Sequence, residues 1–144
     1  RAQELSHFLL IELGLCTVRA YFTETFSRGM KQKLSVAGAF IHEPQLIMLD
    51  EPLNGLDAAA ARLVKTMLLD YVRQGNAVIL TTHVLDVAER MAEQIGILNR
   101  GQLIAAGTLD ELRAESGEES GTLESVFLGL IDESDRSFER DKQG

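Results

Sequence analysis

Short runs of apolar residues alternate along this chain with segments in which apolar residues recur every three or four positions. Residues 46–49, 77–80 and 95–98 form continuous apolar runs of strand length. Their lack of polar alternation is typical of strands covered on both faces, as in a parallel sheet. Residues 58–74 and 85–93 lie between these runs and have helical spacing. Strands that alternate with helices predict a three-layer α/β sheet.

Helical spacing also marks the first part of the chain. Residues 3–15 carry apolar side chains on one stripe, and Gly14 lies close to the expected end of that helix. Ser27 precedes a second helical run that Pro44 ends. We therefore expect two helices before the first strand.

The last third of the chain carries turn and capping signals. A turn at residues 99–102 leads from the third apolar run into a strand at residues 103–105, so a hairpin is expected. Residues 108–111 match a capping box, which predicts a short helix after them. Residues 122–130 read as another helix, whereas the alternating acids and bases of residues 132–144 predict a disordered tail.

Composition narrows the class of protein. With 144 residues, of which 45% are hydrophobic, the chain can bury a core as a single domain. Cys16 is the single cysteine, which fits a reducing compartment, and we expect a cytoplasmic protein. It contains no run of about 18 apolar residues, so no segment is expected to cross a bilayer. The formal net charge of −8 argues against a nucleic-acid partner.

Two acidic residues follow the first apolar run directly. Asp50 and Glu51 come at the carboxyl end of the predicted strand, where open α/β sheets bind ligands. The pair alone fits a solvated acidic turn equally well. Pro52, Asp57 and His83 at their distances from the pair favour a catalytic site.

The order of these motifs resembles the ATP-binding cassette (ABC) ATPase of membrane transporters, read from its signature motif onward. Residues 26–30 look like a divergent form of the family's Leu-Ser-Gly-Gly-Gln signature, and residues 27–32 resemble exporter-type cassettes. The resemblance covers about residues 1–130. No glycine in the chain is followed by lysine, so the family's phosphate-loop motif is absent from it. The implied fold is α/β, a partial P-loop NTPase three-layer fold with part of the helical subdomain and without the phosphate-loop half.

The resemblance implies roles for three residues in ATP hydrolysis with Mg²⁺. Asp50 would help to hold Mg²⁺ through water, and Glu51 would orient and deprotonate the attacking water. His83 would contact the γ-phosphate and that water. A lone histidine at a strand end is more often structural, but the spacing from the acid pair favours the catalytic role.

The resemblance also implies contacts across a dimer. Ser27, Arg28, Gly29 and Met30 would contact ATP held by the opposite subunit, with Arg28 and Met30 as departures from the common signature. Asp57 would lie in the D-loop, which couples the two ATP sites. Simpler roles exist for two of these residues, because Ser27 and Asp57 both precede predicted helices and can serve as N-caps.

The implied organisation has four parts. Residues 1–44 would be part of the helical subdomain with the signature helix, and residues 45–116 the catalytic α/β core with the Walker B motif, D-loop and His switch. Residues 117–131 would form a C-terminal helix and residues 132–144 the disordered tail.

The leading functional interpretation is the ATP-binding and hydrolysing subunit of an ABC exporter, present here as a segment that is inactive alone without the Walker A loop. Its implied partners are a second ABC ATPase subunit, identical or different, and a transmembrane permease that holds it on the inner face of the cell membrane. Two alternatives remain. One is a non-hydrolytic fragment that docks on an intact cassette, and the other is a soluble ABC protein outside transport.

Overall fold

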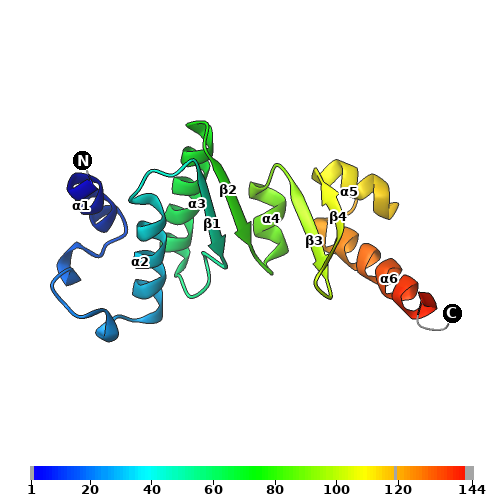
Figure 1. The fold of residues 1–144 in the computed structure, drawn as a ribbon, viewed down its shortest axis with the longest axis horizontal. Coiled ribbons are helices and arrows are strands. Elements are labelled where there is room, and N and C mark those ends of the chain that lie inside the picture. The colour runs from blue at the N-terminus through cyan, green and yellow to red at the C-terminus, as the bar shows by residue number, and fades with distance from the viewer. Residues whose placement is uncertain (1, 119, 142–144) are drawn as a thin grey trace. The chain divides into compact units, whose positions relative to one another are not determined.

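The computed structural model describes residues 2–118 and 120–141, and the chain divides into two compact units, Arg1–His83 and Val84–Gly144 (Figure 1). The first unit contains three α-helices, two short 3-10 turns and two strands. In chain order these are α1 (Ala2–Glu12), η1 (Cys16–Val18), η2 (Thr23–Thr25), α2 (Arg28–Phe40), β1 (Leu46–Asp50), α3 (Ala58–Arg73) and β2 (Ala77–Thr81). Gly14 has a φ of +68°, in the left-handed region that ends helices, just after α1.

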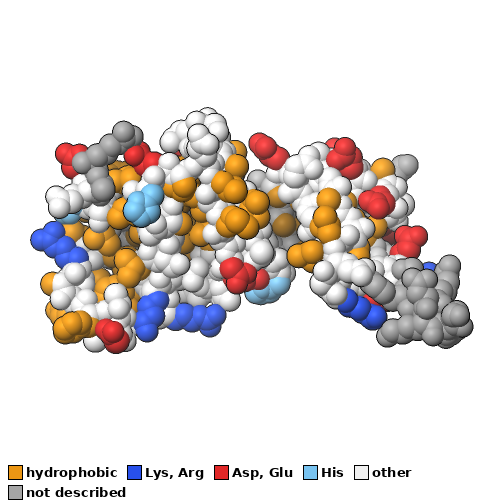
Figure 2. Space-filling model, viewed as in Figure 1, with side chains coloured by type: hydrophobic (Ala, Val, Ile, Leu, Met, Phe, Trp, Pro, Cys, Tyr) orange, Lys and Arg blue, Asp and Glu red, His pale blue; other side chains and the backbone are white. Residues whose placement is uncertain are grey.

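The predicted parallel pairing is present in the first unit. β1 and β2 run parallel in a register that places Met48 beside Ile79 and Asp50 beside Thr81. Ile47 is buried at 2% exposure, whereas Met48 on the opposite face is 69% exposed. Figure 2 shows hydrophobic side chains gathered over β1 and β2 on the face in view. The expectation that this strand is covered on both faces is therefore wrong for the described residues.

Two helices pack against the sheet of the first unit. α2 contacts β1 and α3 contacts β2. The rings of Phe40 on α2 and Tyr71 on α3 meet edge to face, with centroids 5.0 Å apart. The Tyr71 hydroxyl donates a hydrogen bond to the carbonyl of Pro44, just before β1. These contacts hold the carboxyl ends of α2 and α3 together beside the start of β1.

The second unit is built on an antiparallel hairpin. Its elements are α4 (Leu85–Met91), β3 (Ile95–Asn99), β4 (Gln102–Gly107), α5 (Leu109–Ser116) and α6 (Leu123–Asp141). β3 and β4 pair antiparallel, which confirms the predicted hairpin. Because β3 pairs with β4 in a sheet of its own, the third apolar run does not extend the β1–β2 sheet. The predicted capping box is also confirmed, since Thr108 and Glu111 cap α5 reciprocally.

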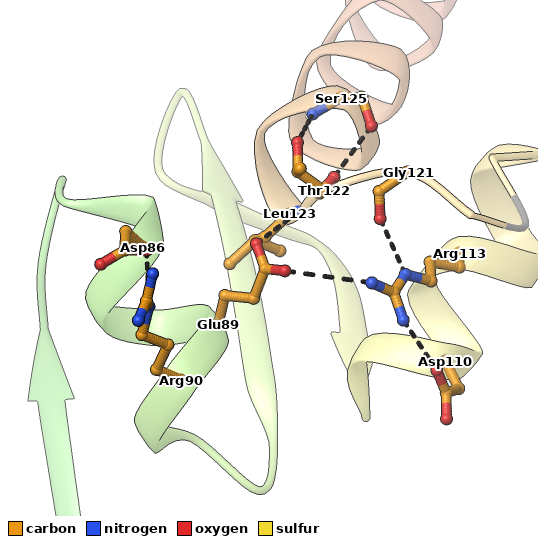
Figure 3. A network of polar contacts seen from close by, with 9 residues as sticks. All are labelled: Asp86, Glu89, Arg90, Asp110, Arg113, Gly121, Thr122, Leu123 and Ser125. Atoms are coloured by element: carbon orange, nitrogen blue, oxygen red, sulfur yellow. Dashed lines mark hydrogen bonds and ion pairs between the residues drawn. The ribbon is translucent and has the colours of Figure 1, made fainter.

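The core of the second unit joins the hairpin to the two last helices. Leu112 and Val126 have no exposed surface, and Ile97 is 3% exposed. Polar contacts from α4 and α5 hold the start of α6 (Figure 3). Glu89 on α4 accepts a hydrogen bond of 2.9 Å from the backbone N–H of Leu123. Arg113 on α5 donates one of 2.8 Å to the carbonyl of Gly121.

The final helix corrects one expectation. α6 continues to Asp141, so the prediction of a disordered tail is wrong for residues 132–141, and residues 142–144 lie outside the described part. The reason is tertiary contact: Asn99 in the hairpin donates to the carboxylate of Asp135 at 2.9 Å, and Arg100 pairs with the same carboxylate at 3.2 Å. The alternation of charges therefore did not reveal this helix, because the partners of Asp135 lie far away in the sequence.

The boundary between the two units falls after His83, within the predicted catalytic core of residues 45–116. The predicted division into subdomains concerns a complete cassette and stays a prediction. Among the helices of the described residues, none combines the length and apolarity needed to cross a bilayer.

Candidate functional site

The carboxyl ends of β1 and β2 bring two predicted site residues together. Asp50 ends β1, and its register partner Thr81 ends β2. The Thr81 hydroxyl donates a hydrogen bond to the Asp50 carboxylate. A hydrogen bond that orients a carboxylate reduces the freedom it would lose on holding a ligand. Asp50 thus stands at the sheet edge where open α/β folds bind ligands.

Glu51 follows the strand in an uncommon backbone conformation. Its φ is +45°, in the left-handed region that side chains other than glycine rarely adopt. The backbone N–H of Glu51 donates to the carbonyl of Thr81 at 3.1 Å, so sheet pairing continues one residue past β1. The positive φ turns the chain sharply at Glu51, while the backbone N–H of Glu51 stays bonded to β2. Such strain concentrates at functional sites.

His83, two residues past the end of β2, contacts the Glu51 carboxylate. The ring Nδ1 lies 2.6 Å from Glu51 Oε1, and the backbone N–H of His83 donates to the same oxygen at 3.0 Å. A ring that carries its proton on Nδ1 donates it to Glu51. The side chain of Glu51 is 29% exposed and that of His83 is 74% exposed. The structure therefore gathers Asp50, Glu51 and His83 at one solvent-accessible edge.

The predicted signature residues lie together at the start of α2. Ser27 is its N-cap, and its Oγ accepts a hydrogen bond of 3.2 Å from the backbone N–H of Met30. Arg28 and Gly29 are the first residues of the helix. The first turn of a helix presents backbone N–H groups without intrahelical partners, and it attracts anions. The N-cap interpretation of Ser27 is thus confirmed, while its role toward ATP stays a prediction.

Asp57 caps the next helix. Its Oδ1 accepts a hydrogen bond of 2.8 Å from the backbone N–H of Ala60, at the start of α3. This bond lowers the pKa of Asp57 below its ordinary value, and the positive charge of Lys33 on α2 lowers it further. Capping is therefore confirmed as one role of Asp57. Its D-loop role stays a prediction.

The signature segment and the loop after Glu51 touch each other within the chain. Gly29 packs so closely on the loop that an added Cβ would lie 2.9 Å from the carbonyl oxygen of Gly55. The side chain of Arg28 lies over Gly55, which has a φ of +78°. Gln32 on the same helix donates a hydrogen bond of 3.3 Å to the backbone carbonyl of Glu51.

The sequence analysis did not single out Gln32. A signal existed, because Gln32 follows Arg28 by four positions and the two share one face of the helix.

The carboxylates of Asp50 and Glu51 at the ends of the strands are chemically suited to Mg²⁺. Carboxylate oxygens are its preferred protein ligands, and it usually keeps several waters beside one or two carboxylates. In the described part of the chain there is no cluster of three or more His, Cys, Asp or Glu side chains that could enclose a metal ion. The holding of Mg²⁺ by Asp50 through water stays a prediction.

Residues 2–54 match the family model described as ABC transporter. The chain is 36% identical over 126 residues to a probable multidrug ABC transporter ATP-binding protein, YbhF, of Escherichia coli (strain K12), covering 85% of this chain and 22% of that protein. It is 41% identical over 118 residues to the daunorubicin resistance ATP-binding protein DrrA3 of Streptomyces coeruleorubidus, covering 81% of this chain and 36% of that protein.

A solved structure of the ATP-binding subunit of an ABC transporter has the same fold. It superposes with a TM-score of 0.84 at 34% identity, covering 90% of this chain and 54% of that one. The predicted fold, part of a P-loop NTPase domain, is confirmed by this likeness. The chain spans about half of that structure and a smaller share of the two relatives.

Proposed function

The chain belongs to the ABC transporter ATP-binding family, and from that membership we propose that it is the signature-to-C-terminus part of an ATPase subunit that drives an exporter. One observation carries the hydrolytic part of this proposal. Glu51 leaves the end of β1 with its carboxylate held by His83 and stands next to Asp50. The export function is supported by the multidrug and daunorubicin-resistance relatives, whose names describe drug transport or resistance.

The three residues at the sheet edge divide the work of phosphoryl transfer. Bound ATP and Mg²⁺ supply an activated γ-phosphate and charge neutralisation. Asp50, oriented by Thr81, holds the ion through water. Glu51 accepts a proton from the attacking water, and His83 keeps the Glu51 carboxylate in place through two hydrogen bonds to Oε1.

The start of α2 acts on nucleotide held by a second subunit. The first-turn N–H groups and the Ser27 hydroxyl offer an anion site. Arg28 adds a positive charge and Met30 replaces the amide of the common signature. Asp57, fixed as the cap of α3, lies in the loop that couples the two sites.

The proposed assembly has two ATPase subunits and a transmembrane permease. In it the cassette lies on the cytoplasmic side, against the inner face of the membrane, through the permease. The 144-residue segment alone does not turn over ATP, because it contains no Gly-Lys-Ser/Thr phosphate loop to position the β- and γ-phosphates.

The test is Glu51→Gln in the full-length ATPase that carries this segment. The amide keeps the shape of the side chain but cannot accept the proton, so ATP binding should be retained and single-turnover hydrolysis should fall by roughly 10²- to 10⁴-fold. His83→Ala should slow hydrolysis as well, because it removes the ring hydrogen bond to the Glu51 carboxylate and leaves only the backbone one. Glu12→Gln, at the exposed end of α1, is the matched control and should keep the parent rate. Parent-level single-turnover rates in both Glu51→Gln and His83→Ala would refute the proposed function.

A further inference from the structure

Hydrogen bonds from three separate parts of the chain hold Glu51 in its strained conformation, in addition to the turn bond of 3.0 Å from the backbone N–H of Asn54 to the Glu51 carbonyl. The backbone N–H is bonded to β2 through Thr81, and the carboxylate is held by His83. The third part is α2, where the side-chain amide of Gln32 donates to the Glu51 carbonyl at 3.3 Å. Because a φ of +45° is unfavourable for a glutamate, these bonds together must select it.

The same helix also holds the far end of the loop that begins at Glu51. Gly29 lies against the carbonyl of Gly55, and the side chain of Arg28 fills the space that a Cβ on Gly55 would occupy. An alanine at position 29 would place its Cβ 2.9 Å from that carbonyl oxygen, and because the oxygen belongs to the backbone, the loop itself would have to move. One rigid helix therefore contacts residues 51–57 at two places, through Gln32 near the start and through its first turn near the end.

We propose that α2 sets the position of Glu51 within its own subunit, with Gln32 as the positioning residue and the Arg28–Gly29–Gly55 contact as a second anchor. This inference rests on the proposed role of Glu51 in hydrolysis. A helix moves nearly as a rigid rod, so a displacement of its first turn is carried to Gln32 one turn later and from there to the backbone of Glu51. The segment that meets nucleotide across the dimer thus also governs the alignment of the base in its own subunit.

Two substitutions at position 32 test this in the full-length ATPase. Gln32→Met keeps the length of the side chain and removes the N–H donor, and Gln32→Glu places a carboxylate oxygen against the Glu51 carbonyl. Each should lower kcat about tenfold or more, because small misplacements of a reacting group are costly, while KM for ATP changes less than about twofold. Gln74→Glu, at the exposed end of α3, is the matched control and should leave both constants at the parent values.

Two further measurements separate positioning from mere stabilisation. The melting temperatures of the Gln32 variants should stay within about 2 °C of the parent, since one partly exposed hydrogen bond contributes little to global stability. In a Glu51→Gln background, Gln32→Met should slow the residual hydrolysis no further, because the group that it positions is already lost.

The outcomes distinguish this inference from the proposed function. If Glu51→Gln itself leaves hydrolysis intact, the proposed function fails and this inference fails with it. If Glu51→Gln blocks hydrolysis while both Gln32 variants retain the parent kcat, only the positioning role is overturned. A loss of kcat that is matched by a lower melting temperature and a higher KM, or that persists in the Glu51→Gln background, would also overturn it.

Discussion

Replacing Glu89 by alanine should destabilise the start of α6. Glu89 projects from α4 toward the loop before α6, where its Oε2 accepts the hydrogen bond from the backbone N–H of Leu123 (Figure 3). Leu123 is 1% exposed, so water cannot easily replace the lost acceptor. The Arg113 guanidinium lies 3.9 Å from the other oxygen of Glu89 and adds a weaker ionic attraction.

The magnitude follows from the partners that remain. A hydrogen bond to a charged acceptor contributes about 1.5–3 kcal/mol, so Glu89→Ala should cost about 2 kcal/mol of local stability. Glu89→Gln keeps an oxygen acceptor and loses only the charge, and it should cost about 1 kcal/mol. Asp86→Ala is the matched control on the same helix. It breaks a pair with Arg90 in which both side chains are at least 64% exposed, and such pairs contribute about 0.3–0.5 kcal/mol.

Native-state hydrogen exchange is the suitable assay. Intrinsic fluorescence would not report on the second unit, because both tyrosines lie in the first unit and the chain has no tryptophan. A loss of about 2 kcal/mol corresponds to exchange roughly 30-fold faster at the amides of the first turn of α6. Glu89→Gln should give about fivefold and Asp86→Ala about twofold. Equal acceleration by Glu89→Ala and Asp86→Ala would refute the assignment of Glu89 as the anchor of α6.

Three other perturbations test the packing and capping of both units. Leu112→Ala removes a side chain with no exposed surface and should lower the free energy of unfolding of its unit by about 3 kcal/mol, measured by denaturant titration followed by circular dichroism; a change below 1 kcal/mol would contradict its central place in the core. Ser27→Ala should lose the cap on Met30 and about 1 kcal/mol of local stability, seen as faster amide exchange in the first turn of α2, while Ser27→Asn should retain the protection. The pKa of Glu111 is lowered mainly by the backbone N–H of Thr108, so its contribution is present above the ordinary value of 4.5 and disappears as the pH falls through the lowered pKa in the folded state. The melting temperature should therefore drop between neutral and acidic pH, and Glu111→Gln should reduce that drop. An equally large drop of the melting temperature in the variant would contradict the assignment.

Local signals in the sequence were sufficient for the capped helices and the acid pair. The capping box at Thr108 and Glu111 needs only four neighbouring residues, and α5 begins where it predicts. Ser27 and Asp57 likewise cap the helices that follow them. The positions of Asp50 and His83 at strand ends follow from short apolar runs, which made the candidate site accessible from the sequence.

Contacts between distant residues account for what the sequence did not reveal. The hydrogen bond from Gln32 to Glu51 joins two elements whose packing is a tertiary property. The hairpin of β3 with β4 was predicted, but an apolar run such as β3 does not state that the hairpin forms a sheet separate from β1 and β2. The helix at residues 132–141 has little apolar signal of its own, and the bond from Asn99 to Asp135 bridges 36 positions. Pattern reasoning cannot see such partners, because it uses only neighbouring positions.

The hairpin and the helix that covers it also have consequences during synthesis. Ile97 leaves the ribosome about 30 residues before Val126, its partner in the same core, which at the usual 5–20 residues per second is a delay on the order of seconds. By the end of that interval β3 and β4 have been synthesised completely, but the helix α6 that buries their apolar face has not. The nascent chain therefore presents a bare two-stranded ribbon, which is a natural target for a ribosome-associated chaperone.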